Sequence, residues 1–204
     1  GHGVTKMKTS DERCNKIFNS EELRTYDYFQ TKFFGMERSI AKVMRFLRSA
    51  SLKGEESRQV LLLLGPVGAG KSALMEHIKS ALEECDSMYH IDGCPIHEEP
   101  LHLIPRSLRP MDANSQDVTI LVGSEDISKL DMYAEDDPRV LSLNGAFNVG
   151  NRGIVEFVEV FKNEIEFLHT MITATQEKAV PSPGKGPMIY FDGVILAHCN
   201  EAEW

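Results

Sequence analysis

The sequence predicts an α/β fold in which a mostly parallel sheet lies between helices. Apolar strand candidates alternate along the chain with segments of helical period, as expected when helices connect parallel strands. At residues 60–84 an apolar strand, a glycine-rich turn and a helix follow one another directly. The 204 residues are 42% hydrophobic, which is enough for one sizeable core. A single main domain is therefore expected.

The first half of the chain contains the clearest elements. Residues 35–51, "GMERSIAKVMRFLRSAS", place apolar side chains between Ile40 and Leu47 on one helical face, and Arg and Lys on the other. Residues 58–65, "RQVLLLLG", form an apolar run typical of a strand buried on both faces of a parallel sheet. Residues 72–84, "SALMEHIKSALEE", return to a helical period.

The second half continues the alternation after a stretch that is interrupted by prolines. Four prolines between residues 95 and 110 disfavour long helices and indicate an irregular excursion up to residue 117. The other expected elements are a short strand at 88–92, a helix at 127–137 that ends before Pro138, a strand at 153–160, a helix at 163–178, a loop or hairpin tip at 180–188, and a last strand from Val194 to Cys199.

Charge and cysteine content limit the classes of partner. The net charge of −9 argues against a broad surface for nucleic acid or anionic membranes, since phosphate groups are bound chiefly by Lys and Arg. No apolar run approaches the roughly 20 residues that cross a bilayer, and the first residues show no signal-peptide pattern. The cysteines form no C-x-x-C pair, which favours a reduced, cytoplasmic protein; they are Cys14, Cys85, Cys94 and Cys199.

One group of metal-binding residue types lies between residues 90 and 102. Imidazole, thiolate and carboxylate are all zinc ligands. Their spacing here matches no zinc motif, so a strand end and loop with ordinary polar residues is the simpler interpretation. The group comprises His90, Cys94, His97, Glu98, Glu99 and His102.

The glycine-rich turn matches the phosphate-binding pattern G-x-x-x-x-G-K-[ST] in full. Its glycines let backbone N–H groups surround phosphate oxygens, and the following helix adds the partial positive charge of its N-terminus. Lys71 would reach the β and γ phosphates, and the Ser72 hydroxyl would bind Mg²⁺. The expected nucleotide-binding residues are Gly65, Pro66, Val67, Gly68, Ala69, Gly70, Lys71, Ser72 and Ala73.

The strand at 153–160 offers two carboxylates near the expected phosphate site. In a usual Walker B strand, four apolar residues are followed by Asp-Glu; here Glu159 takes the Glu position, whereas Val158 takes the Asp position. We expect Glu159 to be the base that activates water, and Glu156, on the same strand face as Val158, to be a metal ligand. A solvated strand edge or a salt bridge is the alternative for both carboxylates.

Asn200 directly follows the last apolar strand, where an amide could hold the attacking water or the γ phosphate. A turn asparagine is the alternative, because asparagine is common in turns. Together with the phosphate loop, the position favours a sensor role.

Several segments together resemble one family, the PrkA-type serine protein kinases of bacteria, whose N-terminal half is an AAA+ ATPase domain. The phosphate loop is shared with very many NTPases, but "YAEDDPR" and "ILAHCNEAEW" are far more particular. The resemblance covers most of residues 26–204 and is carried by "FFGMERSIAKVMRFLRSAS", "LLLLGPVGAGKSAL", "DVTILVGSEDISKLDMYAEDDPR", "GNRGIVEFVEVFK", "HTMITATQE" and "FDGVILAHCNEAEW".

This resemblance implies a P-loop NTPase (AAA+) core, residues 26–204, that binds ATP and Mg²⁺ and forms homo-oligomers in the full-length protein. Residues 1–25 would be an N-terminal tail, whose first three residues resemble a cloning remnant. The resemblance also makes Glu159 part of Walker B and Asn200 the first sensor. It further implies that Phe34, Gly35 and Met36 border the adenine.

The sequence departs from the family pattern in two places. An insertion that the family usually carries near residues 110–112 has no counterpart here. The sequence also ends just after the sensor strand, so the helical lid, its sensor arginine, the arginine finger and the kinase-like C-terminal part are not represented. We therefore expect a fragment truncated before the lid.

Four functions remain open from the sequence. The first is an ATP-driven module that remodels a partner protein, and the second is the serine/threonine kinase of the family name, although no H-R-D-x-x-x-x-N or D-F-G motif is present. The third is a nucleotide-dependent switch with little turnover, which Val158 favours. A small-molecule kinase would share the loop but would not explain the sensor asparagine.

Overall fold

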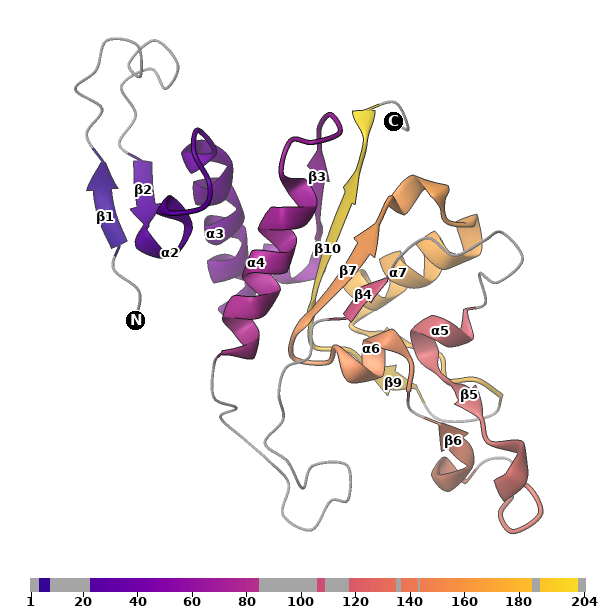
Figure 1. Ribbon diagram of the computed structural model, residues 1–204. Helices are drawn as coiled ribbons and strands as arrows, with labels where there is room; N and C mark the ends of the chain where they lie inside the picture. Colours follow the sequence, from indigo (N-terminus) through magenta and orange to yellow (C-terminus); the bar gives the residue numbers. More distant parts are fainter. Residues whose placement is uncertain are drawn as a thin grey trace. The chain divides into compact units, whose positions relative to one another are not determined.

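The computed structural model describes residues 4–7, 23–84, 106–108, 118–134, 137–142, 144–184 and 188–201 (Figure 1). The chain divides into two compact units, Gly1–Gly54 and Glu55–Trp204. The expected short strand at 88–92 and the group of zinc-type residues at 90–102 lie outside the described residues.

The first unit combines a small antiparallel ladder with two helices. Strand β1 (Val4–Met7) pairs with β2 (Leu23–Tyr26), so part of the expected tail forms β-structure. Helix α2 (Asp27–Gln30) follows, and α3 (Glu37–Ser51) confirms the helix predicted from the period of its apolar residues. The core of the unit contains aromatic rings packed edge to face or tilted, and its buried apolar residues are Phe29, Phe33, Ile40, Val43 and Ala50.

The second unit is built on a four-stranded parallel sheet in the order β3-β10-β7-β4. Its strands are β3 (Val60–Leu64), β10 (Val194–Cys199), β7 (Ile154–Val158) and β4 (Arg106–Leu108). The register places Leu61 opposite Leu196 and Leu196 opposite Glu156. The α/β fold with a parallel sheet predicted from the sequence is thereby confirmed.

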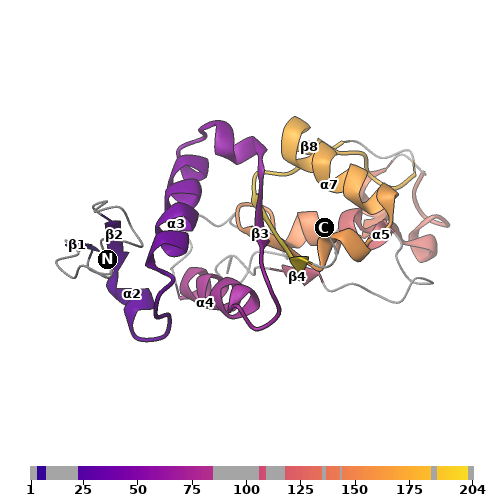
Figure 2. The ribbon, with the colours of Figure 1, turned by 90° about the horizontal axis from the view of Figure 1, so that it is seen from above.

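Helices cover both faces of this sheet (Figure 2). Helix α7 (Ile165–Glu177) packs on the face that presents Val155, Phe157 and Ile195, and this side holds the main hydrophobic core. Helix α4 (Lys71–Glu83) lies on the opposite face and buries Leu74, Met75 and Ile78. Alternation along a strand therefore decides which helix each side chain meets.

The remaining elements are short and connect the main strands and helices. Two antiparallel pairs, β5 with β6 and β8 with β9, lie outside the main sheet. The bounds are η1 (Glu55–Arg58), α5 (Thr119–Val122), β5 (Ser124–Glu125), η2 (Ile127–Lys129), η3 (Pro138–Val140), β6 (Leu141–Ser142), α6 (Ala146–Val149), η4 (Val160–Lys162), β8 (Ala179–Val180) and β9 (Ile189–Tyr190).

The helix predicted at residues 127–137 is wrong. In the described part of this range only the 3-10 helix η2 forms, and η3 begins at Pro138, after the predicted helix would have ended. The backbone bonds close turns of three residues: the Lys129 N–H donates to Asp126 at 2.9 Å and the Leu130 N–H to Ile127 at 3.2 Å. Such bonds give 3-10 geometry in place of a continuous α-helix.

Two further differences concern the sheet. Strand β4 was not predicted, because it is only three residues long and falls among the prolines of the expected irregular excursion. Strand β3 is only partly buried rather than covered on both faces. Among the described residues β3 is an edge strand, which has β10 along one edge and no strand along the other.

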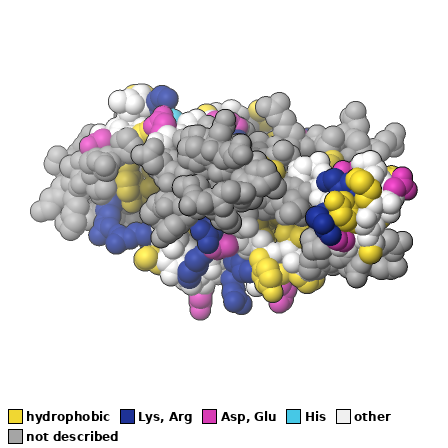
Figure 3. Space-filling model, turned by 90° about the horizontal axis from the view of Figure 1, so that it is seen from below, with side chains coloured by type: hydrophobic (Ala, Val, Ile, Leu, Met, Phe, Trp, Pro, Cys, Tyr) yellow, Lys and Arg dark blue, Asp and Glu magenta, His cyan; other side chains and the backbone are white. Residues whose placement is uncertain are grey.

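The surface carries charges of both signs. Figure 3 shows one face, where dark blue Lys and Arg side chains lie close to magenta Asp and Glu and to exposed hydrophobic groups. Within the described ranges, no helix combines the length and the hydropathy that crossing a membrane requires.

A glycine substitution tests the packing of α5 against the β5-β6 pair. Gly123 has φ +93° and ψ −172°, a conformation almost restricted to glycine, and a Cβ there would lie 2.3 Å from the Ser142 carbonyl oxygen. We expect Gly123→Ala to lower the free energy of unfolding by about 2–3 kcal/mol in urea denaturation. Gly65→Ala is the control, since its Cβ would meet only ordinary contacts at 3.9 Å. Equal stability of the two variants would contradict the prediction.

Candidate nucleotide-binding site

The glycine-rich loop connects β3 to α4, as the sequence predicted. Gly68 and Gly70 have φ of +80° and +82°, which turn the chain tightly and which residues with a Cβ rarely adopt. The Ala69 N–H donates to the Pro66 carbonyl at 3.3 Å, and the Leu74 N–H donates to Gly70 at 2.9 Å as the helix begins. The loop therefore ends in a helix N-terminus, the arrangement that binds phosphate groups.

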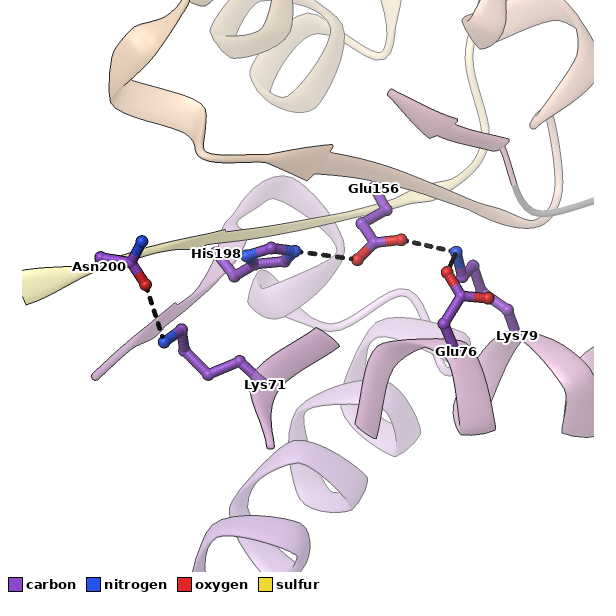
Figure 4. Close-up of polar contacts among 6 residues, drawn as sticks. All are labelled: Lys71, Glu76, Lys79, Glu156, His198 and Asn200. Carbon is purple, nitrogen blue, oxygen red and sulfur yellow. Dashed lines mark hydrogen bonds and ion pairs between the residues drawn. The ribbon is translucent and has the colours of Figure 1, made fainter. Parts of the chain in front are cut away.

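Lys71 folds back over the loop. Its Nζ donates to the carbonyl oxygens of Gly65 at 2.6 Å and Pro66 at 2.7 Å, and to Asn200 Oδ1 at 3.3 Å (Figure 4). The contact joins two residues that are 129 positions apart in sequence. The structure thus brings together the loop lysine and the asparagine predicted as sensor.

The other loop residues differ in their exposure to solvent. Gly65 is buried at the end of β3, whereas Pro66, Val67, Gly68 and Ala69 are exposed. Ser72 and Ala73 are exposed in the first turn of α4. A hydroxyl at this position is open to a ligand held by the loop.

Glu159 lies at the same edge of the sheet as Asn200. Val158 pairs with His198 in register, so Glu159 and Asn200 both follow the carboxyl ends of adjacent parallel strands. Glu159 is in the left-handed region, with φ 50° and ψ 52°, which is uncommon for a residue with a side chain. Its Oε2 forms an ion pair with Lys162 Nζ at 2.6 Å.

Glu156 does not fit the metal-ligand role expected from the sequence. The side chain is buried on the face toward α4, with an exposed fraction of 1%. Its Oε2 lies 2.6 Å from Lys79 Nζ, and its Oε1 lies 3.2 Å from His198 Nε2. A Mg²⁺ ligand needs oxygens open to the ion and its waters, whereas these oxygens face a buried ammonium and an imidazole. The alternative of a salt bridge is what the structure shows.

Lys79 is held by two carboxylates. Its Nζ contacts Glu76 at 2.5 Å as well as Glu156. Burial lowers the pKa of Lys79, but the hydrogen bonds and charges of Glu156 and Glu76 outweigh burial, so the pKa lies above its ordinary value. The stabilisation from charged Lys79 is therefore complete below the unfolded pKa of about 10.4 and is lost as pH rises through the higher folded value.

Lys79 and His198 were missed in the sequence, although spacing could have indicated both. Lys79 lies seven residues after Ser72, two turns along the same face of α4. His198 lies two residues before Asn200, on the same face of β10. Each therefore shares a face with a residue of the phosphate site.

Phe34, Gly35 and Met36 belong to the first compact unit and directly precede α3. Phe34 is 81% exposed, and Gly35 has φ +74°. The adenine contact expected of these residues stays a prediction, as do the nucleotide-binding and catalytic roles assigned above.

Sequence comparison decides the family. The model of the PrkA AAA domain matches residues 4–111 and 107–204, which together cover nearly the whole chain. The chain belongs to the PrkA AAA domain family. The resemblance seen in the sequence is thereby confirmed, and the two matched stretches meet where the family insertion was expected to be missing.

Two curated PrkA-family relatives show how much of a longer protein the chain represents. The serine/threonine kinase YeaG of Escherichia coli strain K12 is 31% identical over 264 residues, covering 100% of this chain and 41% of the relative. The ATP-dependent protease PrkA of Bacillus subtilis strain 168 is 30% identical over 241 residues, covering 89% and 38%. The chain therefore spans about two fifths of the length of these relatives.

A solved structure supports the AAA fold. The chain is similar to one from the complex of magnesium chelatase subunits BchI and BchD, with a TM-score of 0.55 and 18% identity. The similarity covers 78% of this chain and 51% of that one. At this identity the likeness supports the fold alone.

The motif "YAEDDPR" that carried part of the PrkA resemblance contains a charged pair. Arg139 donates from Nε and Nη2 to Asp137 at 2.9 and 2.5 Å, and its guanidinium lies 4.0 Å from the centre of the Tyr133 ring. These hydrogen bonds lower the pKa of Asp137 from 3.8 to about 2. Stability from this pair is present above the unfolded pKa and is lost as pH falls through about 2.

We expect Arg139→Met to raise the pKa of Asp137 toward 3.8, because the hydrogen-bond donors and the positive charge are removed. A carboxyl-carbon NMR titration of the folded protein measures this pKa. Lys129→Met is the matched control, since Lys129 pairs with Asp126 instead. An Asp137 pKa that stays near 2 without Arg139 would refute the assignment.

Proposed function

We propose that this chain is the ATP-binding AAA+ domain of a PrkA-like serine protein kinase, binding Mg-ATP at the loop of residues 65–72. The observation that carries the proposal is the contact of Lys71 with Asn200, which joins the phosphate loop to the tip of the neighbouring strand. A chance glycine turn would have no reason to meet a strand-tip amide. Membership in the PrkA AAA domain family, with relatives named as a kinase and an ATP-dependent protease, supports an ATP-using role.

The loop residues are suited to hold a triphosphate. The backbone N–H groups at the start of α4 and the helix N-terminus favour negative charge. The Lys71 ammonium, now on its own loop carbonyls, would exchange them for β and γ phosphate oxygens, which are stronger acceptors. Phe34, Gly35 and Met36 are proposed to border the adenine.

Metal binding would depend on few protein ligands. Ser72 is exposed and fits a role as the hydroxyl ligand, and Mg²⁺ often keeps several waters and binds through the nucleotide phosphates. Bound Mg²⁺ would supply neutralisation of phosphate charge. Val158 offers no carboxylate, and Glu156 faces Lys79, so neither residue fits the role of a second protein ligand of Mg²⁺.

Glu159 is proposed as the base that accepts a proton from the attacking water, with Asn200 orienting that water or the γ phosphate. The left-handed conformation of Glu159 supports this role, since strained backbone often occurs at functional sites. Its ion pair with Lys162 must open before the carboxylate can act as a base.

Two uses of the bound ATP are proposed, in order of preference. In the full-length protein, hydrolysis or phosphotransfer would serve the kinase activity of the family. The alternative is a nucleotide-dependent switch or an ATP-driven protein-remodelling module without kinase activity. Val158 at the usual Asp position and the ion pair on Glu159 favour the switch, because both would reduce turnover. We further propose a cytoplasmic homo-oligomer acting on a protein substrate.

Lys71→Ala tests nucleotide binding. Loss of a charge-assisted contact to the phosphates should weaken the affinity for Mg-ATP by at least about 100-fold in calorimetric titration. Lys129→Ala is the control for removal of a lysine in the same unit, and its affinity should match the wild type. Equal affinities of the two variants would remove the basis of the proposal.

Glu159→Gln separates binding from turnover. The neutral amide keeps the shape of the side chain but cannot accept the proton, so phosphate release should fall by about 100-fold or more while ATP affinity is kept. Lys162→Met, which frees the carboxylate, should keep ATP affinity and should not lower phosphate release. Undiminished phosphate release in the Glu159 variant would exclude it as the base.

The two uses of ATP are separated by the fate of the γ-phosphate. Radiolabel on a serine of a protein substrate, lost in Lys71→Ala, would indicate phosphotransfer. A rate of phosphate release per protein molecule that rises with protein concentration would indicate an oligomeric ATPase. Binding with neither outcome would indicate the switch.

A further inference from the structure

Two polar links connect α4 to the sheet. The first is at the nucleotide end, where Lys71 contacts Asn200. The second lies deeper, where Lys79 pairs with Glu156 of β7, and Glu156 contacts His198 of β10 (Figure 4). Both links end at the carboxyl end of β10, on His198 and on Asn200, which directly follows the strand.

The two links form a closed path. Lys71 and Lys79 are eight residues apart on α4, about 12 Å along its axis. His198 and Asn200 are separated by about 7 Å along the strand direction. Glu156 bridges the gap between Lys79 and His198 from the neighbouring strand β7, where it pairs in register with Leu196. The position of Asn200 relative to Lys71 is therefore tied to the position of His198 relative to Lys79.

The deeper link is almost fully enclosed. The exposed fractions are 5% for Lys79, 1% for Glu156 and 4% for His198. A buried charge is tolerated only when an opposite charge lies close to it, and here the Lys79 and Glu156 atoms are 2.6 Å apart. A slide of α4 along the sheet would separate these charges in a place that water does not reach, and apolar contacts carry no comparable penalty.

We propose that Glu156, together with Lys79 and His198, is a positioning cluster that sets the place of Asn200 against Lys71 and thereby the preference for ATP over ADP. The second half of this inference rests on the proposed function, because only a bound nucleotide can be discriminated. The first half concerns the protein without ligand. Glu156 acts through Asn200 and touches no nucleotide.

The test separates positioning from stability with a double variant. Glu156→Gln alone leaves Lys79 with only the exposed Glu76 and should lower the melting temperature by roughly 10 °C. Glu156→Leu with Lys79→Met replaces the pair by apolar groups of similar size, and the melting temperature should stay within a few degrees of the wild type. If the cluster served stability alone, the double variant would behave like the wild type in the two readouts that follow.

The first readout needs no nucleotide. The side-chain amide resonance of Asn200, identified by its loss in Asn200→Asp, should shift or broaden in the double variant, because its contact with Lys71 is no longer fixed. Glu76→Gln removes only the exposed partner of Lys79 and should leave this resonance unchanged. An Asn200 resonance that is the same in the wild type and the double variant would overturn the proposal.

The second readout compares dissociation constants for ADP and for a non-hydrolysable ATP analogue. The double variant should keep ADP affinity within about twofold but lose at least about fivefold of the preference for the ATP analogue, and Asn200→Ala added to it should cause no further loss. Full preference, or additive losses, would overturn the role in discrimination. Failure of the wild type to bind either nucleotide would instead reject the proposed function, while the amide readout would still decide the positioning.

Discussion

The position of β10 between β3 and β7 is the constraint on which the rest of the second unit depends. Parallel pairing on both sides of β10 brings the carboxyl ends of three strands to one edge of the sheet. The phosphate loop leaves β3 there, Glu159 follows β7, and Asn200 follows β10. None of these residues is near another in sequence, so the site exists only because the strand order is fixed.

The local elements could be predicted from the sequence, because their signals lie within a few residues. The bounds of β10 and the start of α4 follow from apolar runs and from the glycine loop. The helix expected at 127–137 is wrong because the backbone bonds after Asp126 close turns of three residues, a local geometry that the period of the side chains does not report. Strand β4 depends on its partner β7 and is too short to show a pattern of its own.

The site was predictable in part for the same reason. Alternation along the strand placed Glu156 on the face of Val158, and the contact of Glu156 with Lys79 shows that this face is turned toward α4 (Figure 4). It could not show the depth of that position, or that Lys79 would lie opposite it. Glu156 lies two residues before the usual position of the Walker B Asp, and its charge is balanced by Lys79 of α4. It therefore links the sheet to α4 instead of binding a metal ion.

The contacts of Lys71 connect these points. Its ammonium is satisfied by two carbonyls of its own loop and by Asn200, so the lysine and the asparagine already share one hydrogen bond. If phosphate oxygens replace these acceptors, as the proposed function requires, Asn200 loses the lysine at the moment when a γ phosphate arrives between them. The Asn200 amide would then form a new hydrogen bond, at a position set by β10. On the proposed function, sensing would therefore be the exchange of one hydrogen-bond partner of Asn200 for another, and its accuracy would depend on how firmly β10 is held against α4.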